Sequence, residues 1–282
     1  MEYLERKEIG DYRITIFPDE CAGSPMTGWD MTGLYLFEYE RGGLHSECNW
    51  SQVFGKYGDS KHTLREAMRV LIEEHCSFTA VVDYIRKGNI DGVRLRYERS
   101  EHMWKLEVYE YCWKSGKWDL VEDIPPTDLR AKEWCYFENL FEYLSKRTLM
   151  DILRQCAPNL YVDWWGSRGY CQGDAIDGIV FCTKERFDKM CGRTDKPWRE
   201  CMPSIVQGEV DCIGKWAWGD VKGFMLERKV TFTKVYDDPE REPQPDYEWE
   251  FVDSCWGYYT DSADELIREV MAEHNIKEEV AA

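Results

Sequence analysis

Three aspartates, Asp163, Asp174 and Asp177, have the type and spacing that could support chemistry. Asp174 and Asp177 flank a short turn just before an apolar stretch at 176–183, and Asp163 lies upstream. Carboxylate oxygens bind divalent cations and exchange protons, so these residues are weak candidates for a metal site or for acid–base catalysis. Asp174 and Asp177 each have a glycine beside them, which is equally typical of ordinary turns.

Nucleophilic catalysis by a cysteine is the second kind of chemistry that the residue types allow. His75 and Cys76 are neighbours, but adjacent residues of a helix point apart, so we do not expect them to form a dyad. The chain has no Walker A, dinucleotide-binding, HExxH or GxSxG motif, and none of its 12 cysteines forms a Cys-x-x-Cys pair. We therefore expect no cofactor and no structural metal, and we favour a non-enzymatic protein over an enzyme.

A dense aromatic segment, Asp253 to Tyr259, lies between an expected strand and the last expected helix. It suits a recognition loop, because Trp and Tyr are enriched at protein interfaces. It suits a packed corner equally well, with Gly257 in a positive-φ conformation. Both interpretations stay open.

Strands and helices alternate irregularly along the chain. Two-residue periodicity predicts strands at 12–17, 33–39, 93–98, 104–111, 118–121, 176–183, 221–236 and 249–255. Helical periodicity and capping residues predict helices at 63–76, 79–86, 127–144, 148–156, 184–190, 202–213 and 263–274. Because hairpins occur without regular βαβ repetition, we expect an α+β fold with mainly antiparallel sheets and packed helices.

Pro125-Pro126 is the best candidate for a domain boundary, because proline interrupts both helices and sheets. It predicts an N-terminal α+β subdomain at 1–124 and a C-terminal one at 125–282, with a single domain as the alternative. The segment 237–247 contains three prolines and many acids, and we expect it to be an exposed turn or linker.

The charge is uneven. The net charge is −18, and from Tyr236 to Ala282 there are 15 Asp and Glu against 3 Lys and Arg. Such a surface repels phosphates, and Arg94, Arg96 and Arg99 are interleaved with acids, so direct binding to nucleic acid is disfavoured. No apolar run is long enough to span a membrane, and the charged N-terminus does not resemble a signal peptide, so we expect a cytoplasmic protein.

The acidic region supplies the candidate protein-binding residues. Its carboxylates can imitate phosphate charge towards a basic partner, and its aromatic residues can act as buried anchors. The acids can also serve solubility alone. The candidates are Asp237, Asp238, Glu240, Glu242, Asp246, Glu248, Trp249, Glu250, Trp256, Tyr258 and Tyr259.

Several blocks of the sequence resemble a known family. They are Trp29-Asp30-Met31-Thr32-Gly33, Asp177 to Glu185, Gly219-Asp220-Val221-Lys222-Gly223-Phe224 and, most specifically, Asp253-Ser254-Cys255-Trp256-Gly257-Tyr258-Tyr259. Their order and spacing resemble an uncharacterised family of proteins that bacteriophages and other mobile elements encode. The resemblance implies expression in the cytoplasm of a bacterial host and carries no known activity.

Three functions follow as expectations. The first is an acidic accessory protein that binds and inhibits a basic host protein, such as a nucleic-acid-binding component of anti-phage defence, by mimicking nucleic-acid charge. The second is a protein that sequesters a small molecule or nucleotide in an aromatic pocket. The third is a divalent-metal hydrolase that uses the three aspartates. Self-association is a further expectation, because the chain has 13 Trp, 17 Tyr and 11 Phe.

Overall fold

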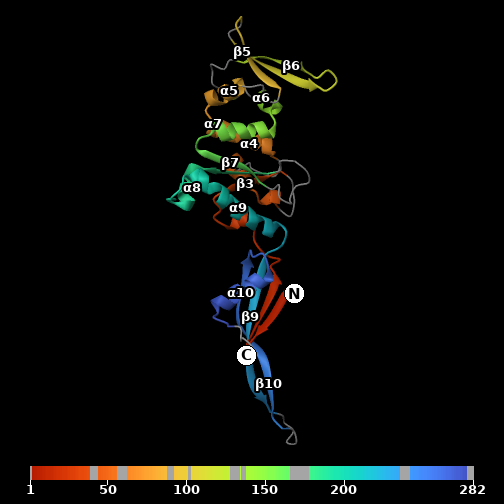
Figure 1. Ribbon diagram of the computed structural model, residues 1–282, viewed down its shortest axis with the longest axis vertical. Coiled ribbons are helices and arrows are strands. Elements are labelled where there is room, and N and C mark those ends of the chain that lie inside the picture. The colour runs from red at the N-terminus through yellow and green to blue at the C-terminus, as the bar shows by residue number, and fades with distance from the viewer. Residues whose placement is uncertain are drawn as a thin grey trace. The chain divides into compact units, whose positions relative to one another are not determined.

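A computed structural model describes residues 2–38, 44–55, 62–87, 92–100, 103–127, 134, 138–165, 178–235 and 242–277. In these residues, helices are combined with three antiparallel sheets, so the predicted α+β class is confirmed (Figure 1). Backbone contacts divide the chain into two units. Unit 1 comprises residues 1–25 and 211–282, and unit 2 comprises residues 26–210. Among the described helices, none is both long and apolar enough to cross a membrane.

Unit 2 contains most of the helices. In chain order its elements are α1 (Pro25–Gly28), β3 (Leu34–Phe37), α2 (Leu44–Glu47), α3 (Trp50–Phe54), α4 (Leu64–His75), α5 (Phe78–Arg86), β4 (Val93–Glu98), β5 (Met103–Cys112), β6 (Lys117–Thr127), α6 (Glu138–Tyr143), α7 (Lys146–Cys156), β7 (Leu160–Trp165), β8 (Gly178–Thr183) and α8 (Lys184–Cys191). Helix α9 (Trp198–Ala217) begins in unit 2 and ends in unit 1.

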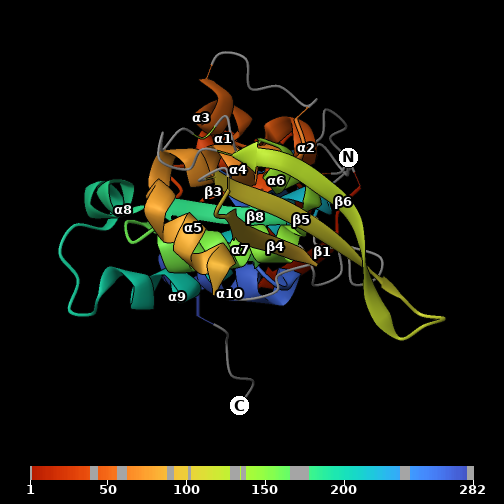
Figure 2. The same cartoon turned by 90° about the horizontal axis from the view of Figure 1, so that it is seen from above.

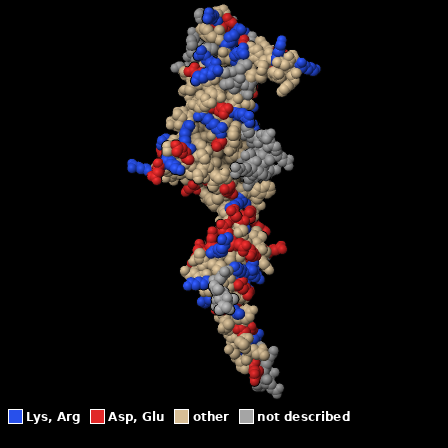
Figure 3. Space-filling model, in the orientation of Figure 1, with Lys and Arg blue, Asp and Glu red and all other residues tan. Residues whose placement is uncertain are grey.

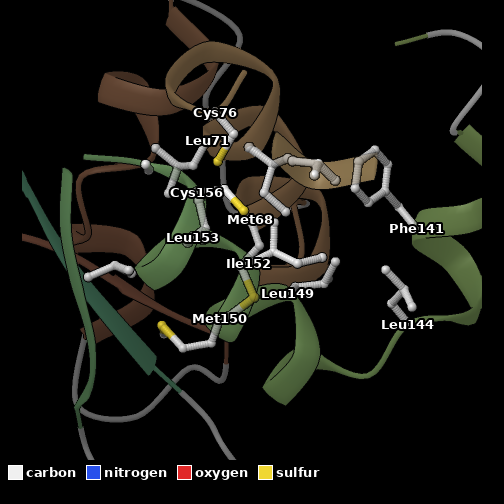
Figure 4. Close-up of a cluster of buried hydrophobic side chains, with 14 of the residues drawn as sticks. Met68, Leu71, Cys76, Phe141, Leu144, Leu149, Met150, Ile152, Leu153 and Cys156 are labelled. Atoms are coloured by element: carbon white, nitrogen blue, oxygen red, sulfur yellow. The ribbon is translucent and has the colours of Figure 1, made fainter. Parts of the chain in front are cut away.

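Helix α4 shows how the sequence directs the core of unit 2. The Thr63 side chain accepts a hydrogen bond from the backbone of Glu66, and the Glu66 carboxylate accepts one from the backbone of Thr63, which forms a capping box. The buried face of α4 packs against α7, and Figure 4 shows Met68 and Leu71 close to Ile152 and Leu153. Burying each such side chain stabilises the fold by about 1.5–3 kcal/mol.

Two three-stranded sheets complete unit 2. One has the order β3-β8-β7, and the other has the order β4-β5-β6. Figure 2 shows the β4-β5-β6 sheet over helices α5 and α7, and its residues Val93, Leu106 and Val108 belong to the same buried cluster as those helices. The inner face of this sheet is therefore part of the core of unit 2.

The predicted break at Pro125-Pro126 is wrong. Strand β6 continues to Thr127, and both prolines lie within it. Strand β6 is an edge strand of its sheet, where a proline that cannot donate a hydrogen bond is tolerated. The helix expected from 127 to 144 is described only as α6, at 138–143. The chain is thus not divided at 124/125. It passes from one unit to the other after residue 25 and again after residue 210.

Unit 1 is built on one antiparallel sheet. Its elements are β1 (Glu5–Ile9), β2 (Tyr12–Pro18), β9 (Lys222–Lys234), β10 (Gln244–Tyr258) and α10 (Ala263–Glu273), and the strand order is β1-β2-β9-β10. Helix α10 buries Leu266, Ile267 and Val270 against one face of the sheet, where they meet Ile14 and Phe224. Strand β10 begins inside the segment that was expected to be a linker, so that expectation is wrong for residues 244–247.

Candidate protein-binding site

The β9–β10 hairpin is longer than the sheet that carries it. The last residue of β9 paired with β2 is Arg228, opposite Tyr12. Beyond it, residues 229–234 of β9 pair only with residues 244–249 of β10 among the described residues. We call this two-stranded part, 229–234 with 244–250, the arm. A two-stranded ribbon in water is only marginally stable by itself, so the arm depends on the sheet at its base.

The two faces of the arm differ in chemistry. Side chains alternate between the faces of a strand, so Asp246, Glu248 and Glu250 share one face of β10. Tyr247, Trp249 and, at the base of the arm, Phe251 share the other face. The register assigns the opposite residues of β9 to the same faces. The acids therefore lie beside Arg228, Val230 and Phe232, and the aromatics lie beside Glu227, Lys229 and Thr231.

Large apolar side chains on the arm and at its base are open to solvent. Tyr247 is 51% exposed and Phe251 is 60% exposed, and Phe232 on the acidic face is also exposed. On the face that Figure 3 shows, uncharged side chains cover most of the lower hairpin. Contiguous exposed apolar surface typically marks a contact with another molecule.

The acidic face keeps much of its charge. Glu250 lies 3.5 Å from Arg228 and Asp246 lies 3.6 Å from Lys234, and all four side chains are well exposed. Such surface pairs contribute little to stability, so a partner could replace them at low cost. Glu248 is exposed and forms no ion pair within the described part of the chain.

Cations order the aromatic face. The Arg13 guanidinium lies 4.5 Å from the Trp249 ring centroid, and the Lys229 ammonium lies 4.2 Å from that of Tyr247. Arg13 also donates a 2.6 Å hydrogen bond to Glu227, which raises the pKa of Arg13 above its usual value. This network fixes the orientation of Trp249, so its ring is held ready for contact.

Three other predicted binding residues lie at the opposite end of β10, against the body of unit 1. The Trp256 ring packs over Gly223, where an added Cβ would lie 2.2 Å from it, and its centroid is 6.0 Å from that of Phe17. Tyr258 is partly buried, which raises its pKa to about 12. Tyr259 is also partly buried and donates a 3.4 Å hydrogen bond to the Gly23 carbonyl.

The aromatic segment from Asp253 therefore has the features of the packed-corner interpretation. Residues 253–258 belong to strand β10 rather than to a loop, and Gly257 has a φ of 86°. Only Gly adopts that conformation without strain.

The remaining acids lie outside the described residues, are exposed near the arm, or support the fold. Asp237, Asp238 and Glu240 lie outside, whereas Glu242 is exposed just before β10. Lys215 donates a hydrogen bond to Asp261 in a 2.6 Å ion pair, and this contact lowers the pKa of the Asp261 carboxyl group. Acids in the first turn of α10 favour its N-terminus through the helix dipole.

Of the three aspartates expected to carry chemistry, only Asp163 lies within the described residues. Asp163 forms an ion pair with Arg154, and its Oδ1 accepts a 2.8 Å hydrogen bond from the Trp164 backbone. Asp174 and Asp177 lie outside the described residues. Within the described part of the chain, no three His, Cys, Asp or Glu side chains are arranged to hold a metal ion.

The Cys76 thiol is unsuited to nucleophilic chemistry. It is buried beside α7, and burial raises its pKa to about 12. A nucleophilic cysteine needs the opposite shift, because the thiolate is the reactive form.

The blocks that carry the family resemblance are used for packing. In unit 2, Arg186 donates to the backbone carbonyl of Thr32, and Glu209 accepts from the backbone of Thr32 and Gly33 at 2.6 and 2.9 Å. A Cβ on Gly33 would lie 2.9 Å from both Glu209 and Tyr35. In unit 1, Phe224 lies opposite Cys255 across β9 and β10. These blocks therefore hold sheets together in each unit.

Sequence reasoning missed part of the arm. Tyr247, Phe251 and Lys229 were not selected, because 237–247 looked like a linker and the strand was expected to begin at Trp249. The signal was nevertheless present, since acids and aromatics alternate strictly from Asp246 to Phe251. Such alternation is typical of a strand with two different faces.

No protein-family model, curated protein or solved structure matches this chain.

Proposed function

We propose that this chain is a non-enzymatic binding protein whose arm attaches to a basic surface of a host protein and blocks it. The observation that carries the proposal is the arm itself, which presents three acids on one face and exposed aromatics on the other. The resemblance to mobile-element proteins supplies the setting, a bacterial cytoplasm, and suggests a defence protein that handles nucleic acid as the target.

The charge of unit 1 supports binding to a basic partner. Unit 1 contains 24 Asp and Glu against 11 Lys and Arg, a net charge of −13, whereas unit 2 has a net charge of only −5. A concentrated negative field speeds the approach of a basic partner and repels nucleic acid. In this proposal, charge therefore accounts for the rate of association and for the preference for a basic partner.

The arm adds affinity. Same-face acids on a strand are about 6.8 Å apart, about twice the spacing of phosphates along the axis of one DNA strand. The row of acids thus carries about half the charge density of a DNA strand, and two of its three members are already close to cations. Charge mimicry alone is weak here, so Tyr247, Trp249 and Phe251 supply the apolar anchors that a stable complex needs.

The test is capture of host proteins with the full chain. The arm variant combines Asp246→Asn, Glu248→Gln and Glu250→Gln. The control variant combines Glu2→Gln, Glu8→Gln and Glu20→Gln, three exposed acids of the same unit that give the same change in net charge. Captured proteins are identified by mass spectrometry at low and high salt, and the best candidate is purified and titrated against all three chains.

We expect one basic protein to bind wild type and control alike, and to bind the arm variant about tenfold or more weakly. A further variant, Phe251→Ala, should weaken binding even at high salt, because its contribution is apolar. Equal binding by the arm and control variants would contradict the proposal, because it would mean that net charge alone is recognised. A purified candidate whose own activity persists when bound would contradict the inhibitory part.

A further inference from the structure

Strand β10 has a free edge. It is the last strand of the β1-β2-β9-β10 sheet, and within the described residues its outer edge pairs with no strand. The backbone groups along such an edge can pair with a strand from another chain. The opposite edge of the sheet, β1, is short and carries Glu5, Arg6, Lys7 and Glu8 in five residues, which discourages pairing there.

The side chains of β10 select against a second copy of this chain. Antiparallel pairing of two β10 strands with Glu248 opposite Glu248 would also place Asp246 opposite Glu250. Like charges directly opposite each other destabilise a pair of strands. A register shifted by one residue would instead place each carboxylate opposite Tyr247, Trp249 or Phe251. Neither arrangement is favourable, so the edge is suited to a different strand.

We propose that an extended basic segment of the partner adds as a strand to the free edge of β10 between Asp246 and Phe251. Its Lys or Arg side chains face the three acids, and its apolar side chains face Tyr247, Trp249 and Phe251. The inference rests on the proposed function and specifies the chemistry of the partner, an alternating basic and apolar segment.

The geometry of a strand imposes this pattern. Backbone hydrogen bonds give affinity to any extended chain, whereas side chains on alternate positions give specificity. Because the acids and aromatics of β10 occupy opposite faces, a matching strand must alternate with the same period of two residues. The regular stretch ends at the register shift between Phe251 and Asp253, which limits the pairing to about six residues.

Synthetic peptides test the inference on the full chain. The probe is a labelled seven-residue peptide in which four Lys alternate with three Val. Its control has the same composition in the order Lys-Lys-Val-Val-Val-Lys-Lys, so that only the period differs. Fluorescence anisotropy should give an affinity about tenfold higher for the alternating peptide.

Two N-methylated forms of the alternating peptide test the backbone pairing. Methyl groups on the Val nitrogens block one edge of the peptide, and methyl groups on the Lys nitrogens block the other. Only one edge can face β10 while Lys faces the acids, so one form should bind about tenfold more weakly than the other. Which form loses affinity tells whether the added strand is parallel or antiparallel. Equal affinities of the two forms would overturn the inference.

The site is located with the chain variants described above. The arm variant should lose the preference for the alternating peptide, whereas the control variant should keep it. If the alternating and scrambled peptides bind the wild-type chain equally, or neither binds, strand addition is overturned. The proposed function would still stand if host-protein capture distinguishes the arm variant from the control variant.

Discussion

The β5–β6 hairpin of unit 2 and the β9–β10 hairpin of unit 1 are both long, and both expose aromatic side chains. At the β5–β6 tip the aromatics contact one another, with ring centroids 5.0 Å apart for Tyr111 and Trp113 and 5.5 Å apart for Tyr111 and Trp118. Further back, one face of β5 is buried in the core of unit 2. On the arm, Tyr247 and Trp249 also lie edge to face, with ring centroids 6.2 Å apart, but each ring additionally contacts a cation and lies beside a free strand edge.

The difference shows that exposure alone does not identify a binding surface. Trp113 is 89% exposed, more than any large side chain of the arm, yet it joins a compact cluster at a turn. The arm combines exposed rings, a row of acids and an edge without proline between Asp246 and Phe251, whereas β6 has two consecutive prolines near its end. A surface for another chain needs such a combination, because affinity, specificity and pairing come from different groups.

The largest expected effect is a difference in stability between a variant on the buried side of the β5–β6 hairpin and one on the exposed side of the β9–β10 hairpin. Leu106→Ala on β5 leaves a cavity in the core of unit 2 and should lower the free energy of unfolding by about 3 kcal/mol. Phe251→Ala on β10 should change it by less than about 0.5 kcal/mol, because that side chain is exposed. Urea unfolding measures both, and similar losses would show that Phe251 supports the fold.

The next effect concerns two glycines of the β4-β5-β6 sheet with similar positive φ values. At Gly92 a Cβ would lie 2.1 Å from the Tyr109 carbonyl oxygen, whereas at Gly116 the nearest atom is 3.9 Å away. Gly92→Ala should cost about 2–3 kcal/mol, and Gly116→Ala about 1 kcal/mol from backbone strain alone. Thermal unfolding compares the two variants. Equal costs would mean that the backbone at Gly92 shifts freely.

A smaller effect tests the cation network at the base of the arm. Arg13→Met removes the partner of the nearly buried Glu227 carboxylate and should cost about 1–2 kcal/mol. Arg228→Met is the matched variant on the acidic face, where the pair with Glu250 is exposed, and should cost less than about 0.5 kcal/mol. Chemical denaturation with tryptophan fluorescence reports both. A negligible cost at Arg13 would show that Trp249 is not held by this network.

The smallest effect leaves stability unchanged and concerns a thiol at the β5–β6 tip. Hydrogen bonds from the Ser115 side chain and from the backbone of Ser115 and Lys114 lower the pKa of Cys112. Its thiolate therefore forms at lower pH, whereas burial raises the pKa values of Cys76 and Cys182 to about 12. At pH 7, the rate of modification by iodoacetamide should be about tenfold or more higher for Cys112 than for Cys76 or Cys182.

Mass spectrometry of tryptic peptides measures the order of modification. Ser115→Ala removes one of the donors and should move the pH profile of Cys112 towards higher pH. An unchanged profile in that variant would show that the turn does not stabilise the thiolate.

Local signals predicted the elements that have strong caps and a clear period. The apolar face of α4 gave its bounds within a residue, and α8 and α10 followed in the same way, whereas α7 begins two residues before its expected start. Strand β1 was missed because four of its five residues are charged, which is typical of a sheet edge and atypical of a core strand. The break at Pro125-Pro126 failed because an edge strand needs no hydrogen-bond donor on its outer side.

The sequence by itself determined the α+β class, the main amphipathic helices and the concentration of acid near the C-terminus, because each depends on neighbouring residues along the chain. Only the tertiary structure decided that 1–25 joins 211–282 in one unit and that β10 lies at an edge. It also decided that Asp246, Glu248 and Glu250 remain on an exposed arm while Asp261 pairs with Lys215. Those outcomes depend on pairings between residues as far apart as Tyr12 and Arg228, and no local pattern of charge or periodicity encodes such a pairing.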